Sequence, residues 1–583
     1  MKKLFLAAVL ISFASLSFSA PVSKDKIESQ RKNRDTTMKI LLKTGKFTEL
    51  VREEKNTMRA ATPGEKENGY ILFSRDYTEP IYHNTVPVAK DVLLCKSFGS
   101  PGEYIPLTFS VYPLKDLKSA KVSSAGLSCG SEKIGAENFE FRTVWHMPKR
   151  SSPGMFTMKP WLLEKKDTLD IEAGEKLLWG AVNLGPTRQW WITVKIPEEA
   201  KPGIYKGTIE FSPANTKASS VPVEIEVLPI KLVSSKNFNM WFFDDPNINN
   251  EKILKSLKEH GLYGNFIGFT PKVSADGLDF ESFDKFVAFL QKNGLNANIM
   301  LASESLSHQI ASILKTQLHS ASFASEGRRM IEKFNKQVKD KYKGSVDICY
   351  FGIDEPANSE DRRKALTPLI KWLKTIEGVK VAETLNSPEM YPLYGPYTDI
   401  NMGYAKWSDL DRAFLASGKD KRLSLNSWID SGSILRARLE PGLFPWKNNY
   451  SLMNMWSFSS SGGDPLNDLD SGDPDWCITG PCENDTEDIM PAVNYESIRK
   501  GIDDRRYVVT LEQVIEKAKG DPALTAKADA AKRLLDSCTF IGDKRDATWT
   551  ALKDPEGYKI VDKFKRDVAD KIIELEQGLN SKK

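Results

Sequence analysis

Two adjacent carboxylates, Asp354 and Glu355, stand between an apolar stretch and Pro356. Residues 346–353 are mostly apolar or aromatic, which is typical of a short strand buried on both faces of a parallel sheet. Pro356 cannot donate a hydrogen bond to a neighbouring strand, so the strand is expected to end beside the two acids. Carboxylates at such a strand end can move a proton or stabilise a developing positive charge. The alternative is that the pair only caps the next helix.

The chain around the acid pair alternates strand-like and helical segments, which predicts a (β/α)8 TIM barrel over residues 235–518. The strand-like segments lie at 238–243, 263–269, 296–302, 346–354, 379–385, 399–403, 423–428 and 451–458. The acid pair follows the fourth segment, which would place it on the rim where barrels carry their catalytic groups. The alternative is an open doubly wound sheet. No glycine-rich phosphate loop follows any strand, which argues against nucleotide binding.

Three other parts of the chain have distinct patterns. Residues 70–234 show short alternating runs separated by proline and glycine, which predicts an N-terminal antiparallel β-sandwich. Residues 21–69 read as a polar leader, and 519–583 as a short C-terminal helical tail. Trp145, Trp161 and Trp179 fall in longer loops of the sandwich. Their rings could stack on sugars or simply cover one end of the sandwich.

The first 20 residues have the layout of a signal peptide, with two lysines, an apolar core and small residues at the end. We therefore expect a secreted or periplasmic protein, and no later segment is apolar enough to span a membrane. Removing these residues takes away two lysines and no acids, so the net charge falls from +4 to +2. That charge gives no reason to expect a nucleic-acid partner. The scattered histidines and cysteines predict neither a metal site nor a cofactor, and the oligomeric state is left open.

Cleavage of a glycosidic bond is one reaction that two carboxylates perform. In barrel enzymes with two catalytic acids the second one often follows the seventh strand, and there Asp430 is the sole candidate. An adjacent pair also suits a mechanism in which the 2-acetamido oxygen of the substrate is the nucleophile. Glu355 would then be the general acid and base, which requires a raised pKa. Asp354 would accept a hydrogen bond from the acetamido N–H and stabilise the charge of the intermediate.

Three stretches resemble glycoside hydrolase family 123 over roughly residues 90–520: 189–207 in the sandwich, Asp354-Glu355-Pro356 in the barrel, and 495–507. The resemblance implies a secreted glycoside hydrolase of the β-N-acetylhexosaminidase or galactosaminidase type. It also implies release of a terminal β-linked N-acetylgalactosamine, or of another 2-acetamido sugar, with retention and with Asp354 and Glu355 as the catalytic pair. Two alternatives remain. One is a glycosidase of other acidic or sulfated polysaccharides that uses Asp430, and the other is a non-catalytic glycan-binding protein.

Residues at other strand ends are candidates for binding a glycan or oligosaccharide substrate. They are Tyr404, Trp428, Trp456, Asn386, Glu383 and Trp241. Aromatic rings are common in the walls of ligand clefts, although each of these rings could equally belong to the barrel core. The polar loop 462–470 has several carboxylates but lacks the final glutamate of an EF-hand, so it is expected to shape the rim rather than to bind calcium.

Overall fold

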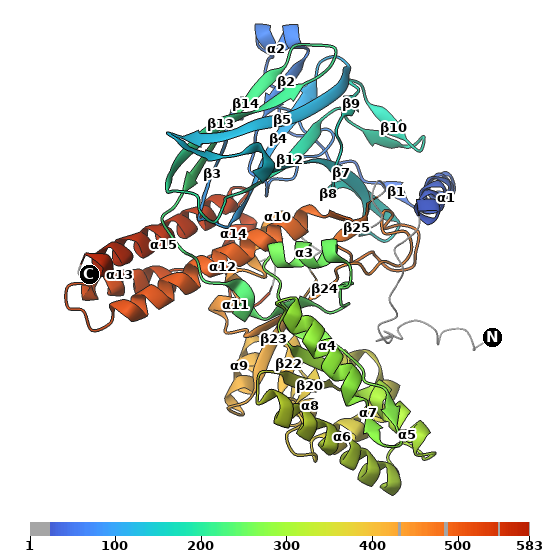
Figure 1. Cartoon of the computed structure of the whole chain (residues 1–583). Coiled ribbons are helices and arrows are strands. Elements are labelled where there is room, and N and C mark those ends of the chain that lie inside the picture. Colours follow the sequence, from blue (N-terminus) through green and yellow to red (C-terminus); the bar gives the residue numbers. More distant parts are fainter. Residues whose placement is uncertain (1–23, 429–432, 483–487, 546–548, 582–583) are drawn as a thin grey trace.

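The computed structural model describes residues 24–428, 433–482, 488–545 and 549–581. A β-sandwich stands above a barrel, and a group of C-terminal helices extends to the side between them (Figure 1). Residues 1–20, for which the sequence predicts a signal peptide, lie outside the described part of the chain. The predicted order of sandwich, barrel and C-terminal helices is confirmed.

The sandwich consists of two sheets that bury an apolar core between them. Alternation places Ile209, Phe211, Val223 and Ile225 in that core, all fully buried. One sheet has the order β1 (Thr48–Glu49), β8 (Met155–Glu164), β7 (Phe139–Ser152), β12 (Arg188–Lys195), β4 (Tyr104–Pro113) and β2 (Tyr70–Phe73). The other has the order β3 (Cys95–Gly99), β14 (Ser219–Val227), β13 (Gly203–Ser212), β5 (Leu117–Cys129) and β6 (Glu132–Ile134).

The segment before the sandwich is part of it rather than a detached leader. Helix α1 (Lys24–Lys43) packs Met38 and Leu41 against Phe156 and Met158 of β8, and all four side chains are buried. Strand β1 pairs with β8 in parallel. A short helix, α2 (Pro63–Asn68), then leads into β2, and Thr62 caps its first turn. The polar character of this segment reflects only its outer face.

Eight parallel strands form the barrel, as the alternation predicts. Their order is β15 (Met240–Phe242), β24 (Leu452–Trp456), β23 (Arg422–Trp428), β22 (Ile400–Gly403), β21 (Val381–Glu383), β20 (Asp347–Phe351), β19 (Asn298–Ala302) and β16 (Phe266–Gly268). Each predicted strand segment overlaps one of them, and only β23 starts earlier than predicted, by one residue. Among the described residues no ladder joins β15 to β16, so the barrel is nearly rather than fully closed.

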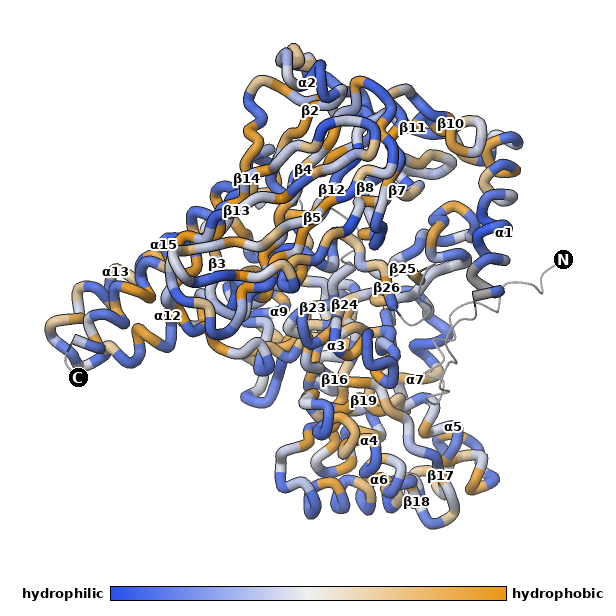
Figure 2. The backbone as a smooth tube through the Cα atoms, turned by 45° about the horizontal axis from the view of Figure 1, so that its top comes forward, coloured by the Kyte–Doolittle hydropathy of each residue, from blue (hydrophilic) through white to orange (hydrophobic). Residues whose placement is uncertain are grey.

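Helices between the strands cover the outside of the barrel. Figure 2 shows apolar positions gathered along β16, β19 and the neighbouring α4. The main covering helices are α3 (Glu251–Glu259), α4 (Phe280–Lys292), α5 (Ser303–Ile313), α6 (Ala321–Tyr342), α7 (Glu360–Leu373) and α9 (Ser408–Ala416). In α4 the side chains of Phe283, Phe286, Val287 and Leu290 are buried, which is the spacing of one helix face.

Helix α12 (Val493–Ala518) joins the parts of the molecule because it lies between the sandwich and the barrel (Figure 1). It packs closely on α10 (Ile434–Leu439): a Cβ at Gly501 would lie 1.9 Å from the carbonyl oxygen of Arg438, so only glycine fits there. Two further long helices, α13 (Thr525–Asp536) and α15 (Gly557–Asn580), pack on α12. The C-terminal region is therefore helical, as predicted.

A buried ionic cluster fixes the sandwich to these helices. Glu103, the residue before β4, is fully buried and accepts hydrogen bonds from Tyr507 (2.6 Å) and from the backbone N–H of Ser100. Its carboxylate also pairs with Lys565 at 2.9 Å and with Lys500 at 3.3 Å. The two ammonium groups hold the pKa of Glu103 well below its usual range, despite burial.

Candidate active site

The acid pair follows β20 on the rim of the barrel. Glu355 has a left-handed backbone (φ 46°, ψ 61°) just before Pro356, which opens a short 3-10 turn (Pro356–Asn358). A non-glycine residue is seldom found in this conformation, and such residues gather at functional sites. Both acids are only partly buried, so their carboxylates remain accessible to a substrate.

Thr384, one residue beyond β21, holds both acids in place. Its hydroxyl donates to Oδ1 of Asp354 at 2.8 Å and accepts from the backbone N–H of Glu355 at 2.5 Å. A single side chain on the neighbouring strand end therefore sets the orientation of one carboxylate and the backbone of the other. Sequence reasoning did not find Thr384. The signal for it was its position at the end of the strand that pairs with β20.

The pKa values of Asp354 and Glu355 are raised above those of ordinary surface carboxylates. Burial raises the pKa of Asp354, and the hydrogen bond from Thr384 opposes that rise. Burial also raises the pKa of Glu355, and the negative charge of Asp354 raises it further, whereas Asn358 and Lys406 act in the opposite direction. Glu355 can therefore keep its proton at a higher pH than a free glutamate can.

Aromatic residues meet at Glu355. The hydroxyl of Tyr404, which follows β22, donates to Oε1 of Glu355. The ring of Tyr404 lies 5.2 Å from that of Trp428, and Trp428 lies 5.7 Å from Trp476. The ammonium of Lys406 lies 5.6 Å from the Tyr404 ring centre and 6.0 Å from that of Trp428. Two of the predicted binding residues, Tyr404 and Trp428, are thus brought to the acid pair.

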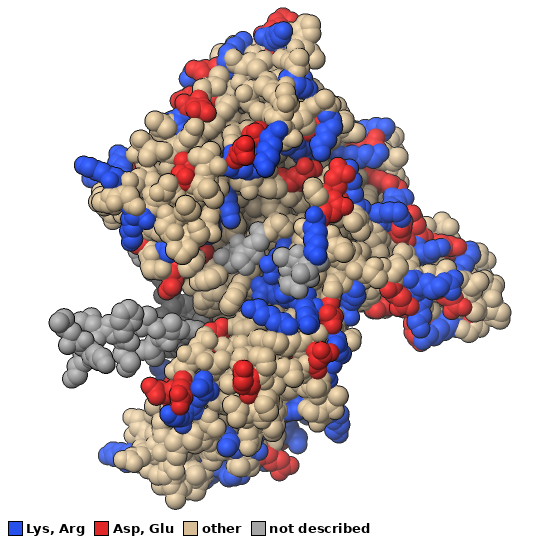
Figure 3. Space-filling view, turned by 180° about the vertical axis from the view of Figure 1, so that it is seen from behind, with Lys and Arg blue, Asp and Glu red and all other residues tan. Residues whose placement is uncertain are grey.

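Lysine and arginine side chains gather in the recess between the sandwich and the barrel on the face seen in Figure 3. Arg436 and Arg545 share the buried carboxylate of Glu440. Lys406, by contrast, is exposed. A recess with this charge distribution attracts anionic ligands.

Trp456 and Asn386 lie on the rim in supporting positions. Trp456 ends β24 and is half-buried, with its ring 6.4 Å from that of Phe243, so it belongs to the cluster that fills the barrel. The side chain of Asn386 accepts from the N–H of Ala357 at 2.9 Å and donates to Asn358 at 3.0 Å. It therefore shapes the turn that follows Glu355.

Glu383 and Trp241 are fully buried, so neither is exposed to a substrate, in contrast to the sequence expectation. Glu383 accepts from the backbone N–H of Ile353 at 2.7 Å, which supports the segment that carries the acids. A Cβ on Gly352 would lie 2.1 Å from its other oxygen, so this packing requires the glycine. Trp241 donates its indole N–H to Asp245 at 3.1 Å. Trp241 lies in the middle of β15 and Glu383 ends β21, and the local sequence does not show that either side chain is covered.

The C-terminal region also contributes to the rim, through Arg545. The backbone N–H of Arg545 donates to the carbonyl of Ala405 at 2.7 Å. Its buried guanidinium pairs with Glu440 and lies 5.9 Å from the ring centre of Trp428. Arg545 therefore supports the two segments that carry Tyr404 and Trp428.

The loop 457–478 after β24 forms another part of the rim and carries Trp476. The sandwich fixes this loop through β7. Arg150 donates to the carbonyls of Asp468 (2.6 Å), Gly472 (2.9 Å) and Ser471, and Lys149 donates to the carbonyl of Asp475 at 3.0 Å. The polar loop noted in the sequence thus lies at the rim. Among the described residues, no three or more His, Cys, Asp or Glu side chains are grouped as metal ligands would be.

Replacing Arg150 by Ala should therefore weaken substrate binding without touching the acid pair. Losing three hydrogen bonds to one loop frees Trp476, and we expect KM to rise roughly tenfold while kcat changes little. Steady-state kinetics would measure this split. Arg328→Ala is a matched control, because Arg328 also bonds a loop carbonyl but on the outer helices. An unchanged KM in Arg150→Ala would show that the loop keeps its place without this contact.

Asp430, the alternative second carboxylate, lies outside the described residues.

None of the helices in the described ranges is both long and apolar enough to cross a membrane.

Comparison with known proteins supports the fold. No family model matches the chain, and neither does any curated protein. Among solved structures it is similar to a family 123 glycoside hydrolase from Clostridium perfringens, studied for glycolipid glycan hydrolysis, at 14% identity and a TM-score of 0.62. The match covers 88% of this chain and 99% of that one. A family 39 glycoside hydrolase from Bacteroides cellulosilyticus WH2 matches at 11% identity over 65% of this chain and 80% of that one. Its TM-score of 0.33 is too low to support a conclusion. The chain thus shares the sandwich-and-barrel fold of a family 123 glycoside hydrolase.

Proposed function

We propose that this protein is a retaining glycoside hydrolase that removes a terminal 2-acetamido sugar, with β-linked N-acetylgalactosamine as the preferred substrate. The observation that carries the proposal is the acid pair on the rim, where one hydroxyl, that of Thr384, contacts both Asp354 and the backbone of Glu355. The sugar named comes from the resemblance of the sequence to family 123. We also propose that the protein is exported, because residues 1–20 have the layout of a signal peptide.

In the first step Glu355 gives its proton to the glycosidic oxygen as the bond to C1 breaks. The acetamido oxygen of the same sugar attacks C1 and forms a cyclic oxazolinium intermediate. Asp354, whose Oδ1 is held by Thr384, accepts the acetamido N–H through Oδ2 and stabilises the positive charge. In the second step Glu355 takes a proton from water, whose oxygen attacks C1 and opens the ring. Two inversions at C1 give net retention.

The raised pKa of Glu355 suits the first step, because a general acid must carry its proton near the working pH. Tyr404 donates to Glu355 and lies beside Trp428, so we propose that these two rings form the wall against which the sugar packs. No step in this scheme needs a metal or a cofactor.

A panel of chromogenic β-glycosides with and without the 2-acetamido group tests the proposal. Turnover confined to 2-acetamido sugars, fastest on the galacto isomer, is the expected result, because only these substrates supply the nucleophile. Equal turnover of glucosides or galactosides would contradict substrate assistance. No turnover of any glycoside, together with glycan binding, would favour a non-catalytic binding protein.

Asp354→Asn should lower kcat by roughly 10²–10³ even on substrates with activated leaving groups, since the amide cannot stabilise the charged intermediate. Kinetics on a nitrophenyl 2-acetamido glycoside would measure it. Asp347→Asn is the matched control, because Asp347 begins the same strand and makes an ion pair with Lys380 far from the rim. Full activity of Asp354→Asn would remove Asp354 from the mechanism.

A further inference from the structure

A cavity of about 600 Å³ lies beside the sandwich and shares no lining residue with the site around Glu355. We call it the α1 cavity. Four segments that are distant in sequence line it: α1, strands β7 and β8 with the residues after them, the hairpin of β10 (Lys176–Leu178) and β11 (Val182–Leu184), and the loop 457–478 with β26 (Ile489–Pro491). Only the folded chain brings these segments together.

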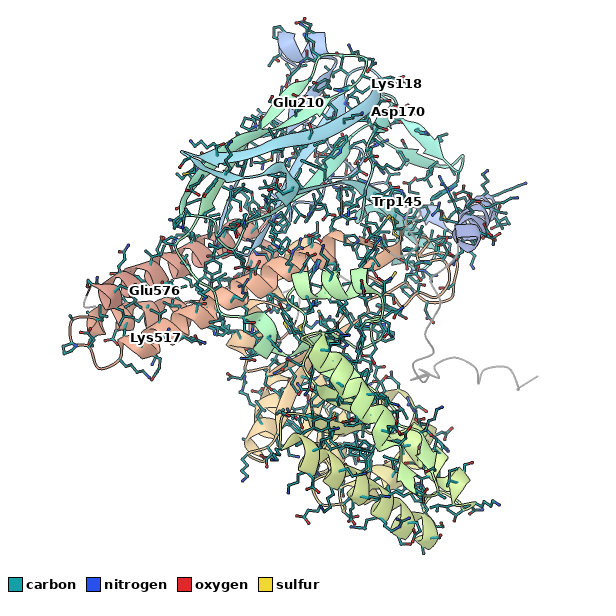
Figure 4. All side chains as sticks on the ribbon, in the orientation of Figure 1. Lys118, Trp145, Asp170, Glu210, Lys517 and Glu576 are labelled. Atoms are coloured by element: carbon teal, nitrogen blue, oxygen red, sulfur yellow. The ribbon has the colours of Figure 1, made fainter. Side chains whose placement is uncertain are left out.

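Two tryptophans stand at this cavity. Trp145 comes from β7, at the lower edge of the sandwich on the side of α1 (Figure 4), and Trp179 comes from the β10–β11 turn. Trp179 and Gly180 both have positive φ (53° and 85°), a turn that favours Asn, Asp or Gly. A bulky ring at such a position is unusual. Asp35 accepts the indole N–H of Trp179 at 3.0 Å, which fixes the orientation of the ring.

The wall that α1 forms is basic. Helix α1 contributes Arg31, Arg34 and Lys39 with one carboxylate, Asp35, at spacings that share a helix face. Arg34 is only 8% exposed, and its guanidinium carbon lies 5.6 Å from the ring centre of Trp145. Asp35 lies 3.8 Å from Nε of Arg34, and the two other charged residues of the lining, Lys166 and Glu164, pair with each other at 2.7 Å. Positive charge therefore exceeds negative charge beside two indole rings.

We propose that the α1 cavity is a second, non-catalytic glycan site, which binds an anionic oligosaccharide that contains uronic acid. Indole faces pack against the C–H faces of sugar rings, and guanidinium groups bind carboxylates with paired hydrogen bonds. That the ligand is a glycan rests on the proposed function; its negative charge follows from the lining. Leu466 lines the cavity, whereas Trp476 of the same loop contacts Trp428, so one loop borders both sites.

Calorimetric titration with an unsulfated chondroitin hexasaccharide tests this, with chitohexaose as the neutral probe of equal length. The full chain carrying Glu355→Gln is used so that no probe is cleaved. Adding Trp179→Asn removes the indole but keeps a residue that suits the turn, and it should weaken chondroitin binding about tenfold. The double variant Arg31→Gln/Lys39→Gln should do the same. Trp446→Ala removes a tryptophan outside the cavity, bonded to Glu512, and should bind as before.

Chondroitin binding that is unchanged in both cavity variants would overturn the proposal, as would an absence of chondroitin binding. Chitohexaose that binds as tightly as chondroitin would contradict the claim that the ligand of the α1 cavity is anionic. In a chain that keeps the wild-type Glu355, Trp179→Asn should leave kcat/KM on a chromogenic monosaccharide unchanged, because the ring of Trp179 does not touch the rim. Failure of the wild-type chain to hydrolyse any 2-acetamido glycoside would refute the proposed function alone, since the binding assay does not depend on turnover.

Discussion

Replacing Glu355 by Gln should abolish measurable hydrolysis of 2-acetamido glycosides whose leaving group is another sugar, a loss of roughly 10³-fold or more. An alcohol leaving group departs only with a proton, and the amide of Gln cannot supply one. Dinitrophenyl glycosides leave without protonation, so the first step on them should be much less affected. Comparing the two substrate classes in one variant therefore isolates proton donation from binding.

The pH profile gives a second readout of the same substitution. Wild-type kcat/KM should fall as pH rises through the pKa of Glu355, because the acid loses its proton there. Burial and Asp354 raise that pKa, so the fall should begin at a higher pH than for an ordinary glutamate. Glu355→Gln should show no such fall on dinitrophenyl glycosides. Glu389→Gln is the control, as Glu389 is exposed on the next rim loop and bonds only Ser387 among the described contacts. A normal rate on sugar leaving groups would exclude Glu355 as the acid.

Glu103→Gln should lower the free energy of unfolding by about 3–5 kcal/mol, the effect of removing one partner from a buried ion pair. The ammonium groups of Lys500 and Lys565 would stay buried without the charge that compensates them. Denaturant unfolding followed by tryptophan fluorescence would measure the change. Glu226→Gln is a matched control, since the pair of Glu226 and Arg566 also joins the sandwich to α15 but is half-exposed, and it should cost less than about 1 kcal/mol.

The stabilisation by Glu103 should depend on pH with a definite sign. Its pKa in the folded protein lies well below the value of about 4.3 expected in the unfolded chain. The contribution is therefore fully present above that value and is lost as pH falls toward the folded pKa. The stability difference between the wild type and Glu103→Gln should narrow below about pH 4. A difference that stays constant down to pH 3 would show that the Glu103 charge is not what stabilises this contact.

The fold was predictable where burial determines the local pattern of apolar and polar residues. The eight barrel strands are short apolar runs because both of their faces are covered, and the alternation in β13 and β14 reflects a single buried face. The position of Asp354 and Glu355 on the rim followed from counting strands. The contacts that both acids make with Thr384 could not be predicted, since they depend on the register between β20 and β21.

Other parts of the site were unpredictable for a different reason. Arg545 reaches the rim from a segment that reads as a surface tail, and Arg150 acts on a rim loop from within the sandwich. Neither contact has a local signal, because each joins segments that are distant in sequence. Trp241 lies in the middle of β15 and is fully buried, whereas Trp428 ends β23 and is half-buried, and the local pattern cannot tell which barrel rings the rest of the molecule covers.

The contact between Glu103 and Lys565 joins residues 462 positions apart, which bears on how the chain is made. A ribosome completes the sandwich sequence long before it reaches α15, so the Glu103 carboxylate lacks this partner until synthesis is nearly finished. Until then its burial would leave a charge without its compensating ammonium, which disfavours early closure of that face. The sandwich is therefore expected to reach its final packing only after the last helix docks. A nascent or truncated chain that lacks α15 should be cleaved by proteases and bound by chaperones more readily than the complete chain, even where its barrel is folded.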